Sequence, residues 1–230
     1  MKIAGLRKLT LLDFPGRVAC VVFTNGCNFR CPFCHNASLV VPKGGHEEIT
    51  EEEFFAFLNK RRGILDGVVI TGGEPTLAHG LYEFIMAVKQ AGYPVKLDTN
   101  GSFPKKLKPL LEAGLLDYVA MDIKTMPERY ERVAGVKVDM DAIGESIAAI
   151  RESGIPHEFR TTVVKGLHTK DDIVQVAKML GKDEAYYLQG FVDSGDVLAE
   201  GCEAFSSAEM HEMLVAAKEF CPKCEIRGVE

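Results

Sequence analysis

The chain has 230 residues, of which 47% are hydrophobic and 26% are charged, and its formal net charge is −6. This length suits one large domain, and we expect a single domain over residues 1–230. Domains that bind nucleic acid normally carry a basic patch, so the acidic balance argues against a nucleic-acid partner. No apolar run reaches the roughly 18 residues that a membrane-spanning helix needs, which argues against a membrane partner.

The cysteines and the N-terminus indicate the compartment. Seven cysteines are an odd number and too sparse for a disulfide scaffold, which points to reducing conditions. The first residues lack the apolar stretch of a secretory signal peptide. We therefore expect a soluble protein of the cytoplasm.

Short apolar runs alternate with helical patterns along the chain. The first run, residues 18–23, is continuously apolar and leads into Asn25-Gly26, as in a strand buried on both faces. Thr50 is a suitable N-cap for a helix that begins with three glutamates. Strands are predicted at residues 18–23, 67–71, 94–98, 118–122, 158–164 and 185–189, with a last short strand at 225–227. Helices are predicted at residues 50–58, 81–91, 104–113, 140–153, 171–180 and 206–220.

This alternation determines the expected fold class. Strands that alternate with helices predict parallel βαβ units with right-handed crossovers. Six units are too few to close a barrel of eight. We therefore predict an α/β fold, an open partial (β/α)6 TIM-like barrel, with a lateral opening that would admit a loop of a protein substrate.

Three cysteines lie within eight residues, Cys27, Cys31 and Cys34, in the spacing C-x3-C-x2-C. Soft thiolates select iron–sulfur clusters, zinc or Cu(I). Structural zinc needs four protein ligands, so a zinc site would have to recruit His35, Cys20 or a distant cysteine. A [4Fe–4S] cluster on three cysteines leaves one iron open to a small ligand. We predict these three cysteines as the metal ligands, and buried structural cysteines remain the other interpretation.

The cysteine loop, with Phe33 before its third cysteine, resembles the radical S-adenosylmethionine (SAM) superfamily. The wider string Asp13-Phe14-Pro15-Gly16-Arg17, followed by the Thr24-to-Asn36 segment, resembles the activating enzymes of glycyl-radical enzymes. Among these it is most similar to the activating protein of anaerobic ribonucleoside-triphosphate reductase. The resemblance implies the radical SAM type of partial barrel, with a [4Fe–4S] cluster and SAM as cofactors.

Ligands of parallel α/β folds bind beyond the C-terminal ends of the strands. The second predicted strand ends in Gly72-Gly73-Glu74. Glycines let backbone groups approach a ligand closely, and Glu74 could accept a hydrogen bond from an ammonium group. The segment would be an ordinary turn if it stood alone. The resemblance implies that it binds the amino group of SAM.

Two further strand ends carry acids. Asp98 and Thr99 end the third predicted strand, and Asp122-Ile123-Lys124 ends the fourth. Turn chemistry and a surface ion pair are the simpler interpretation of these residues. The resemblance implies that Asp98, Thr99 and Asp122 hold a monovalent cation, and that Asp122, Ile123 and Lys124 contact SAM.

Four more residues are candidates for SAM contacts. Arg160 lies in an apolar strand, where its guanidinium could clamp a carboxylate or form a salt bridge. By resemblance Gln189 stands where pyruvate formate-lyase activators present a histidine near adenine. Phe33 could stack on adenine or seal the loop. His35 is expected beside the cluster rather than on its iron.

By resemblance the activity is a radical SAM oxidoreductase reaction: the reduced cluster cleaves SAM, and the radical takes hydrogen from a glycine of anaerobic ribonucleotide reductase. Flavodoxin or ferredoxin would supply the electron, and no side chain would act as acid, base or nucleophile. Activation of another glycyl-radical enzyme, of the pyruvate formate-lyase type, and a small-molecule radical SAM reaction are two further possibilities. A non-catalytic Fe–S electron carrier would leave the strand-end motifs without a role. Cys202, Cys221 and Cys224 could form a redox or metal site.

Overall fold

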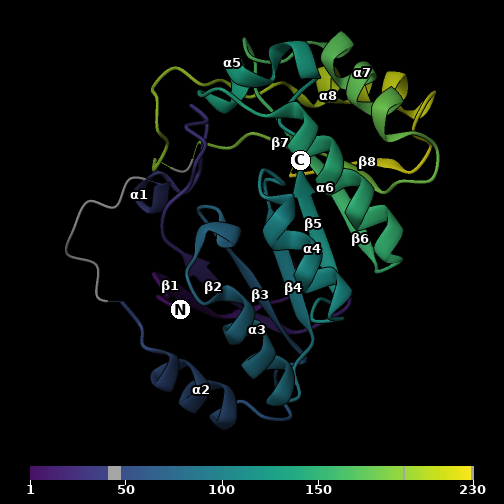
Figure 1. Ribbon diagram of the computed structural model, residues 1–230. Helices are drawn as coiled ribbons and strands as arrows, with labels where there is room; N and C mark the ends of the chain where they lie inside the picture. The colour runs from purple at the N-terminus through teal and green to yellow at the C-terminus, as the bar shows by residue number, and fades with distance from the viewer. Residues whose placement is uncertain (41–47, 194, 229–230) are drawn as a thin grey trace. The chain divides into compact units, whose positions relative to one another are not determined.

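The computed structural model describes residues 1–40, 48–193 and 195–228, and strands alternate with helices along it (Figure 1). The chain divides into two compact units. The first comprises Met1–Asn28, Ser38–Ala120 and Asp141–Pro156. The second comprises Phe29–Ala37, Met121–Met140 and His157–Glu230.

The strands of the first unit are β1 (Gly5–Thr10), β2 (Ala19–Thr24), β3 (Gly67–Gly72), β4 (Val95–Thr99) and the first residues of β5 (Tyr118–Asp122). β2 pairs with β3 in parallel over six residues, and β3 pairs with β4 in parallel. Their apolar runs are buried, as continuous hydrophobic strands of parallel sheets are. The C-terminal ends of these strands therefore finish at one edge of the sheet.

β1 was not predicted. It pairs antiparallel with β2, with Gly5 opposite Phe23 and a register shift between Arg7 and Thr10. Three of its six residues are exposed, so it lacks the buried apolar run that marks the other strands. Charged side chains and a bulge are typical of an edge strand.

The helices of the first unit are mostly those predicted. They are α2 (Glu51–Lys60), α3 (Leu81–Gln90), α4 (Pro104–Glu112) and, apart from its first residue, α6 (Met140–Ser153). Two short elements were not predicted: η1 (Pro75–Leu77) and, again apart from its first residue, α1 (Ala37–Val40). The capping residue of α2 was predicted correctly. The Thr50 side chain accepts a hydrogen bond from the Glu53 backbone N–H, and the Glu53 carboxylate accepts one from the Thr50 backbone N–H.

The second unit contains the end of β5 and the parallel strands β6 (His157–Val163), β7 (Tyr186–Gly190) and β8 (Cys224–Arg227). Its helices are α5 (Tyr130–Ala134), α7 (Lys170–Leu180) and α8 (Ser207–Lys218), with the 3-10 turn η2 (Pro127–Arg129). α5 and η2 were not predicted, because a single helical turn carries too little periodicity to be recognised. The short last strand was predicted and is present.

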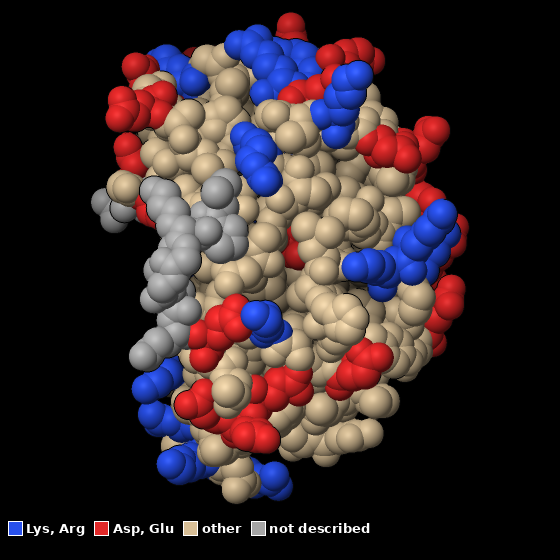
Figure 2. Space-filling view, turned by 60° about the vertical axis from the view of Figure 1, so that its left-hand side comes forward, with Lys and Arg blue, Asp and Glu red and all other residues tan. Residues whose placement is uncertain are grey.

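The surface agrees with the mixed composition. On the face drawn in Figure 2, lysines and arginines are interspersed with aspartates and glutamates. Within the described part of the chain, every helix is too short or too polar to cross a membrane.

Candidate active site

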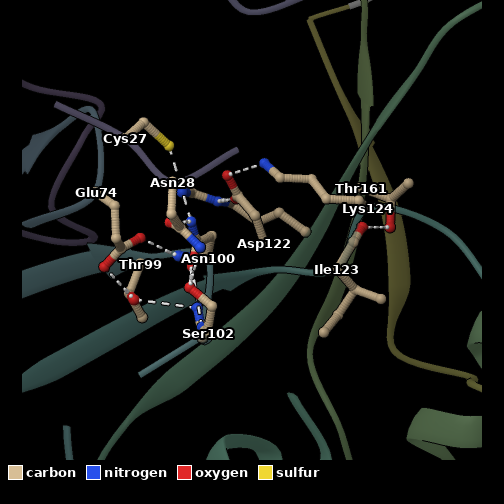
Figure 3. A network of polar contacts seen from close by, with 12 residues as sticks. Cys27, Asn28, Glu74, Thr99, Asn100, Ser102, Asp122, Ile123, Lys124 and Thr161 are labelled. Atoms are coloured by element: carbon tan, nitrogen blue, oxygen red, sulfur yellow. Dashed lines mark hydrogen bonds and ion pairs between the residues drawn. The ribbon is translucent and has the colours of Figure 1, made fainter. Parts of the chain in front are cut away.

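In the first unit, the carboxylate of Glu74 joins the ends of β3 and β4 (Figure 3). Its Oε1 accepts from the hydroxyls of Thr76 and Thr99, at 2.5 and 2.8 Å. Its Oε2 accepts from the backbone N–H of Asn100 at 2.6 Å. The side chain is buried, with 1% of the residue exposed. Glu74 therefore holds the protein's own loops, and its predicted bond to an ammonium group stays a prediction.

Burial is the largest influence on Glu74 and raises the pKa of its carboxyl group. The hydrogen bonds from Thr76, Asn100 and Thr99 oppose that effect without reversing it. The Glu74 carboxyl group therefore binds a proton more readily in the folded protein than in water.

Gly72 and Gly73 allow two loops to touch through their backbones. The N–H of Gly73 donates to the carbonyl of Thr24, and the N–H of Glu74 donates to the carbonyl of Gly26. A Cβ at Gly73 would collide with the Gly26 carbonyl, and one at Gly72 would collide with the Thr24 backbone. These glycines therefore allow close contact with the loop that leads into Cys27, and their role in binding SAM stays a prediction.

Asn100 ties the same strand end to the first cysteine. Its side-chain amide donates to the Asn28 side chain at 3.0 Å and lies 3.9 Å from the Cys27 sulfur. Its carbonyl oxygen accepts from the backbone N–H of Ser102 at 3.0 Å. Asn100 was not among the predicted site residues, because an Asn-Gly pair is an ordinary turn signal.

Asp98 has a lysine partner that the sequence analysis missed. The ammonium of Lys96 lies 2.5 Å from Asp98 Oδ1, and only 2% of the Lys96 side chain is exposed. Lys96 also lies over the ring of Tyr118, 5.8 Å from its centroid. A buried lysine with a carboxylate and an aromatic face is a fixed cation.

In the second unit, Phe29–Ala37 contains the rest of the cysteine loop. Cys31 is buried, and the Cys34 N–H donates to the Cys31 carbonyl at 3.1 Å. Phe33 is 3% exposed and meets His168 edge-on, with 6.2 Å between ring centroids. This burial favours the interpretation that Phe33 seals the loop. His35 is exposed and stacks on Phe191 at 5.4 Å.

Asp122, Lys124 and Arg160 form one cluster in the second unit. Asp122 accepts from Arg160 Nε at 2.9 Å and from Lys124 Nζ at 3.0 Å. Burial opposes ionisation of Asp122, but the two cations outweigh it, and the pKa of Asp122 is lowered. Burial likewise opposes the positive charge of Lys124. The Asp122 carboxylate, through its charge and its hydrogen bond, and other nearby groups together outweigh this effect of burial, so the pKa of Lys124 is raised. Asp122 and Lys124 are therefore both charged at neutral pH.

Backbone bonds fix the segment that carries this cluster. The N–H of Ile123 donates to the Arg160 carbonyl, and the Ile123 carbonyl accepts from the Thr161 hydroxyl at 2.7 Å (Figure 3). His168 Nε2 lies 2.8 Å from the Lys124 carbonyl, and His168 Nδ1 accepts from the Val164 N–H. His168, which sequence reasoning missed, thus holds both Phe33 and the Lys124 backbone.

Two of the three residues predicted to bind a monovalent cation already pair with positively charged side chains of the protein. Asp98 is paired with Lys96 in the first unit, and Asp122 is paired with Arg160 and Lys124 in the second. The Thr99 hydroxyl donates to Glu74. These pairings do not favour an additional cation at any of the three residues.

Gln189 and the remaining cysteines complete the predicted set. Gln189 stands on β7 opposite Thr162 of β6 and Arg227 of β8. Cys20, Cys221 and Cys224 are fully buried, and the Cys221 thiol donates to the Glu184 carbonyl. A redox or metal role of the C-terminal cysteines stays a prediction.

The residues of the second unit fit a cluster with a polar ligand. Thr125 Oγ1 and the Tyr130 hydroxyl are buried and have no hydrogen-bond partner among the described residues. They follow the Asp122-Ile123-Lys124 segment, and the Tyr130 ring packs against Phe29 of the cysteine loop. Among the described residues, no three His, Cys, Asp or Glu side chains already form a metal-binding group. The thiolates as metal ligands therefore stay a prediction, based on the chemistry of soft donors.

Comparison with known proteins decides the family. The model of the radical SAM superfamily matches residues 21–180. This chain belongs to the radical SAM superfamily. Members use a [4Fe–4S] cluster and SAM, which confirms the predicted cofactors at the level of the family.

Two relatives show different extents of similarity. A protein of Methanocaldococcus jannaschii, provisionally named a glycyl-radical enzyme activating enzyme, is 31% identical over 99% of this chain and 96% of its own length. A protein of Thermococcus kodakarensis, provisionally named a GTP 3′,8-cyclase, is 34% identical over 70% of this chain and 53% of its own.

Solved structures confirm the fold. A domain of a pyruvate formate-lyase-activating enzyme from Bacteroides vulgatus aligns with a TM-score of 0.57 over 70% of this chain and 99% of its own, at 17% identity. A radical SAM methyltransferase from Sphaerobacter thermophilus aligns with a TM-score of 0.72 over 96% of this chain and 68% of its own, also at 17% identity. The α/β fold, an unclosed barrel of the radical SAM type, was predicted correctly, and the chain is a radical SAM enzyme.

Proposed function

We propose that this chain activates a glycyl-radical enzyme, and that its partner is anaerobic ribonucleoside-triphosphate reductase. The observation that carries the first statement is the extent of the alignment. The relative named as an activating enzyme matches from end to end, whereas the chain spans about half of the relative named as a cyclase. The choice of partner is supported by the similarity of the Asp13-to-Arg17 string and the cysteine loop to the activating protein of anaerobic ribonucleotide reductase. It is also supported by Gln189, which stands where pyruvate formate-lyase activators have a histidine.

We assign one group of residues to cluster binding and another to SAM binding. Cys27, Cys31 and Cys34 would hold the cluster. Gly72, Gly73 and Glu74 would shape the loop against which the SAM methionine lies. Asp122, Ile123, Lys124, Arg160 and Gln189 would face SAM, with Phe33 and His35 beside the loop.

Charge explains why the second unit suits SAM. Methionine's carboxylate needs cations, and Arg160 and Lys124 supply two, both bonded to Asp122. Asp122, kept ionised by them, supplies a negative charge for an ammonium or sulfonium group. When bound and reduced, a cluster held by these cysteines would supply the electron for cleavage of SAM to methionine and a 5′-deoxyadenosyl radical. The side chains bind, orient and exclude water, and none is needed as acid, base or nucleophile.

The partner would present a glycine whose Cα–H bond is broken by that radical. A flavodoxin or ferredoxin would deliver the electron, and the cytoplasm would be the location. Oxidation-sensitive clusters and seven cysteines suit a reducing compartment.

Electron paramagnetic resonance tests the proposal. The reconstituted protein, SAM, a reductant and anaerobic ribonucleotide reductase are mixed without oxygen, and a glycyl-radical doublet is expected on the reductase. A pyruvate formate-lyase in its place distinguishes the other activase assignment. Cleavage of SAM without a doublet on either partner would contradict the proposal.

A small-molecule radical SAM reaction is the second candidate. The similarity to the cyclase, 34% over 70% of this chain, is the observation that favours it. SAM cleavage that is stimulated by a nucleotide such as GTP, but by neither protein partner, would support that candidate instead.

A further inference from the structure

Five charged side chains of the second unit alternate in sign from β8 through β6 to the end of β5. Arg227 of β8 meets Glu158 of β6 through two bonds, Nη1 to Oε1 at 3.0 Å and Nη2 to Oε2 at 2.9 Å. Glu158 Oε1 also lies 3.9 Å from Arg160 Nη1. Arg160 in turn bonds Asp122, and Asp122 bonds Lys124.

Glu158 is the buried centre of this series, with 1% of the residue exposed. A carboxylate removed from water must be compensated by cations and hydrogen bonds. Arg227 provides this in bidentate form, one nitrogen to each oxygen. Arg227 is itself held against Tyr187, with 3.3 Å between its guanidinium carbon and the ring centroid.

The distances show how Arg160 is shared between two acids. Its bond to Asp122 is 2.9 Å, whereas its approach to Glu158 is 3.9 Å. Glu158, which has the bidentate partner Arg227, is thus farther from Arg160 than Asp122 is. Without Arg227, the buried Glu158 charge would attract the neighbouring Arg160 more strongly and would draw it away from Asp122.

We propose that Arg227 is a positioning residue: by occupying Glu158, it leaves Arg160 on Asp122 in the geometry that SAM binding uses. This inference rests on the proposed function, because it assigns Arg160 and Asp122 to the SAM site. It adds two residues to that site, Arg227 and Glu158, neither of which belongs to the strand-end motifs.

The test is a double-mutant cycle read by the SAM dissociation constant of the reconstituted holoprotein. Arg227→Met leaves Glu158 charged and should weaken SAM binding by about tenfold, the usual effect of losing a supporting contact. Glu158→Gln removes the competing charge, so alone it should change binding by no more than about threefold. The double variant should return to within about threefold of the wild type, because no buried acid then competes for Arg160.

Two measurements separate positioning from simple stability. Arg227→Lys keeps a cation for Glu158 and should recover much of the binding. The melting temperature of each variant is measured beside the binding constant. Lys165→Met, which removes the exposed ion pair with Glu209 in the same unit, is the control and should bind SAM normally.

The outcomes are distinct. If Arg227→Met binds SAM as the wild type does, or if the double variant stays as weak as Arg227→Met, the inference is wrong while the proposed function stands. If Glu158→Gln alone is as weak as Arg227→Met, Glu158 supports Arg160 directly and the inference is again wrong. If the wild type itself fails to bind SAM, the proposed function fails and the inference with it.

Discussion

The backbone N–H of Asn100 donates to Glu74 Oε2 over 2.6 Å, which joins the loop after β4 to the loop after β3 through a buried carboxyl group. Asn100 also reaches Asn28 and the Cys27 sulfur with its side-chain amide. The Gly-Gly-Glu segment is thus connected to the first predicted cluster ligand by side chains of a single unit. Its glycines and its glutamate can be tested separately.

Glu74→Gln should destabilise the protein by about 1–3 kcal/mol, the cost of an unmatched buried polar group. In the wild type, the Thr76 and Thr99 hydroxyls and the Asn100 N–H donate to two carboxylate oxygens of Glu74. A glutamine offers one acceptor oxygen, and its NH2 group would face one or more of these donors. Urea unfolding of both proteins measures the loss.

The same comparison has a pH dependence. Burial raises the folded-state pKa of Glu74, so folding favours the protonated form. Its contribution is therefore fully present below the unfolded pKa, about 4.3, and is lost as pH rises through the folded value. The stability gap between wild type and Glu74→Gln should narrow with rising pH. A gap that widens would mean that the hydrogen bonds outweigh burial.

Gly73→Ala should move the loop that begins at Gly26, because the new Cβ would collide with the Gly26 carbonyl. We expect lower stability and reduced iron uptake, since Cys27 is the next residue. Gly144→Ala is the matched control: Gly144 lies inside α6 with nothing within 4 Å of a Cβ. That control should gain about 0.5–1 kcal/mol, as alanine does in a helix. Normal iron content in Gly73→Ala would contradict the loop contact.

Replacing Cys27, Cys31 or Cys34 by Ser should abolish cluster assembly, measured as iron and sulfide per chain after anaerobic reconstitution. Cys20→Ala and Cys202→Ser should retain iron. Burial raises the pKa of Cys20 to about 12, so its thiol is protonated and unsuited to metal at neutral pH. A Cys31→Ser variant with a complete, SAM-responsive cluster would refute the ligand assignment.

Monovalent salt should have little effect on SAM binding. Asp98 already has Lys96, and Asp122 already has Arg160 and Lys124. Exchanging potassium or sodium for choline at constant ionic strength should change the dissociation constant by less than about threefold. Lys96→Met would leave Asp98 without that ammonium and should introduce a dependence on small cations. A strict potassium or sodium requirement in the wild type would support the cation site predicted from the sequence.

Local patterns allowed part of this description to be predicted. The parallel strands, the Thr50 cap and the Cys27-to-Cys34 loop each depend on neighbouring residues, which sequence shows directly. β1 was missed because half of its side chains are exposed, so it has no apolar run. The contact of Gly73 with the loop at Gly26 was not predicted, because sequence shows that a glycine is needed but not which backbone approaches it. The role of this glycine in SAM binding stays a prediction.

The missed site residues are those defined by distant partners. Lys96 would ordinarily be a surface residue, and only the fold places it beside Asp98 and Tyr118. Glu158 and Arg227 are 69 positions apart and meet because β6, β7 and β8 are adjacent. His168 follows β6 in an irregular loop and gains its role from contacts with Phe33 and Lys124.

Transfer of a labelled hydrogen tests the central claim most directly. The partner reductase is prepared with glycine deuterated at Cα, and the 5′-deoxyadenosine formed under anaerobic turnover is analysed by mass spectrometry. Direct abstraction predicts one deuterium in 5′-deoxyadenosine for each glycyl radical formed. Unlabelled 5′-deoxyadenosine, with or without a glycyl doublet, would contradict the account.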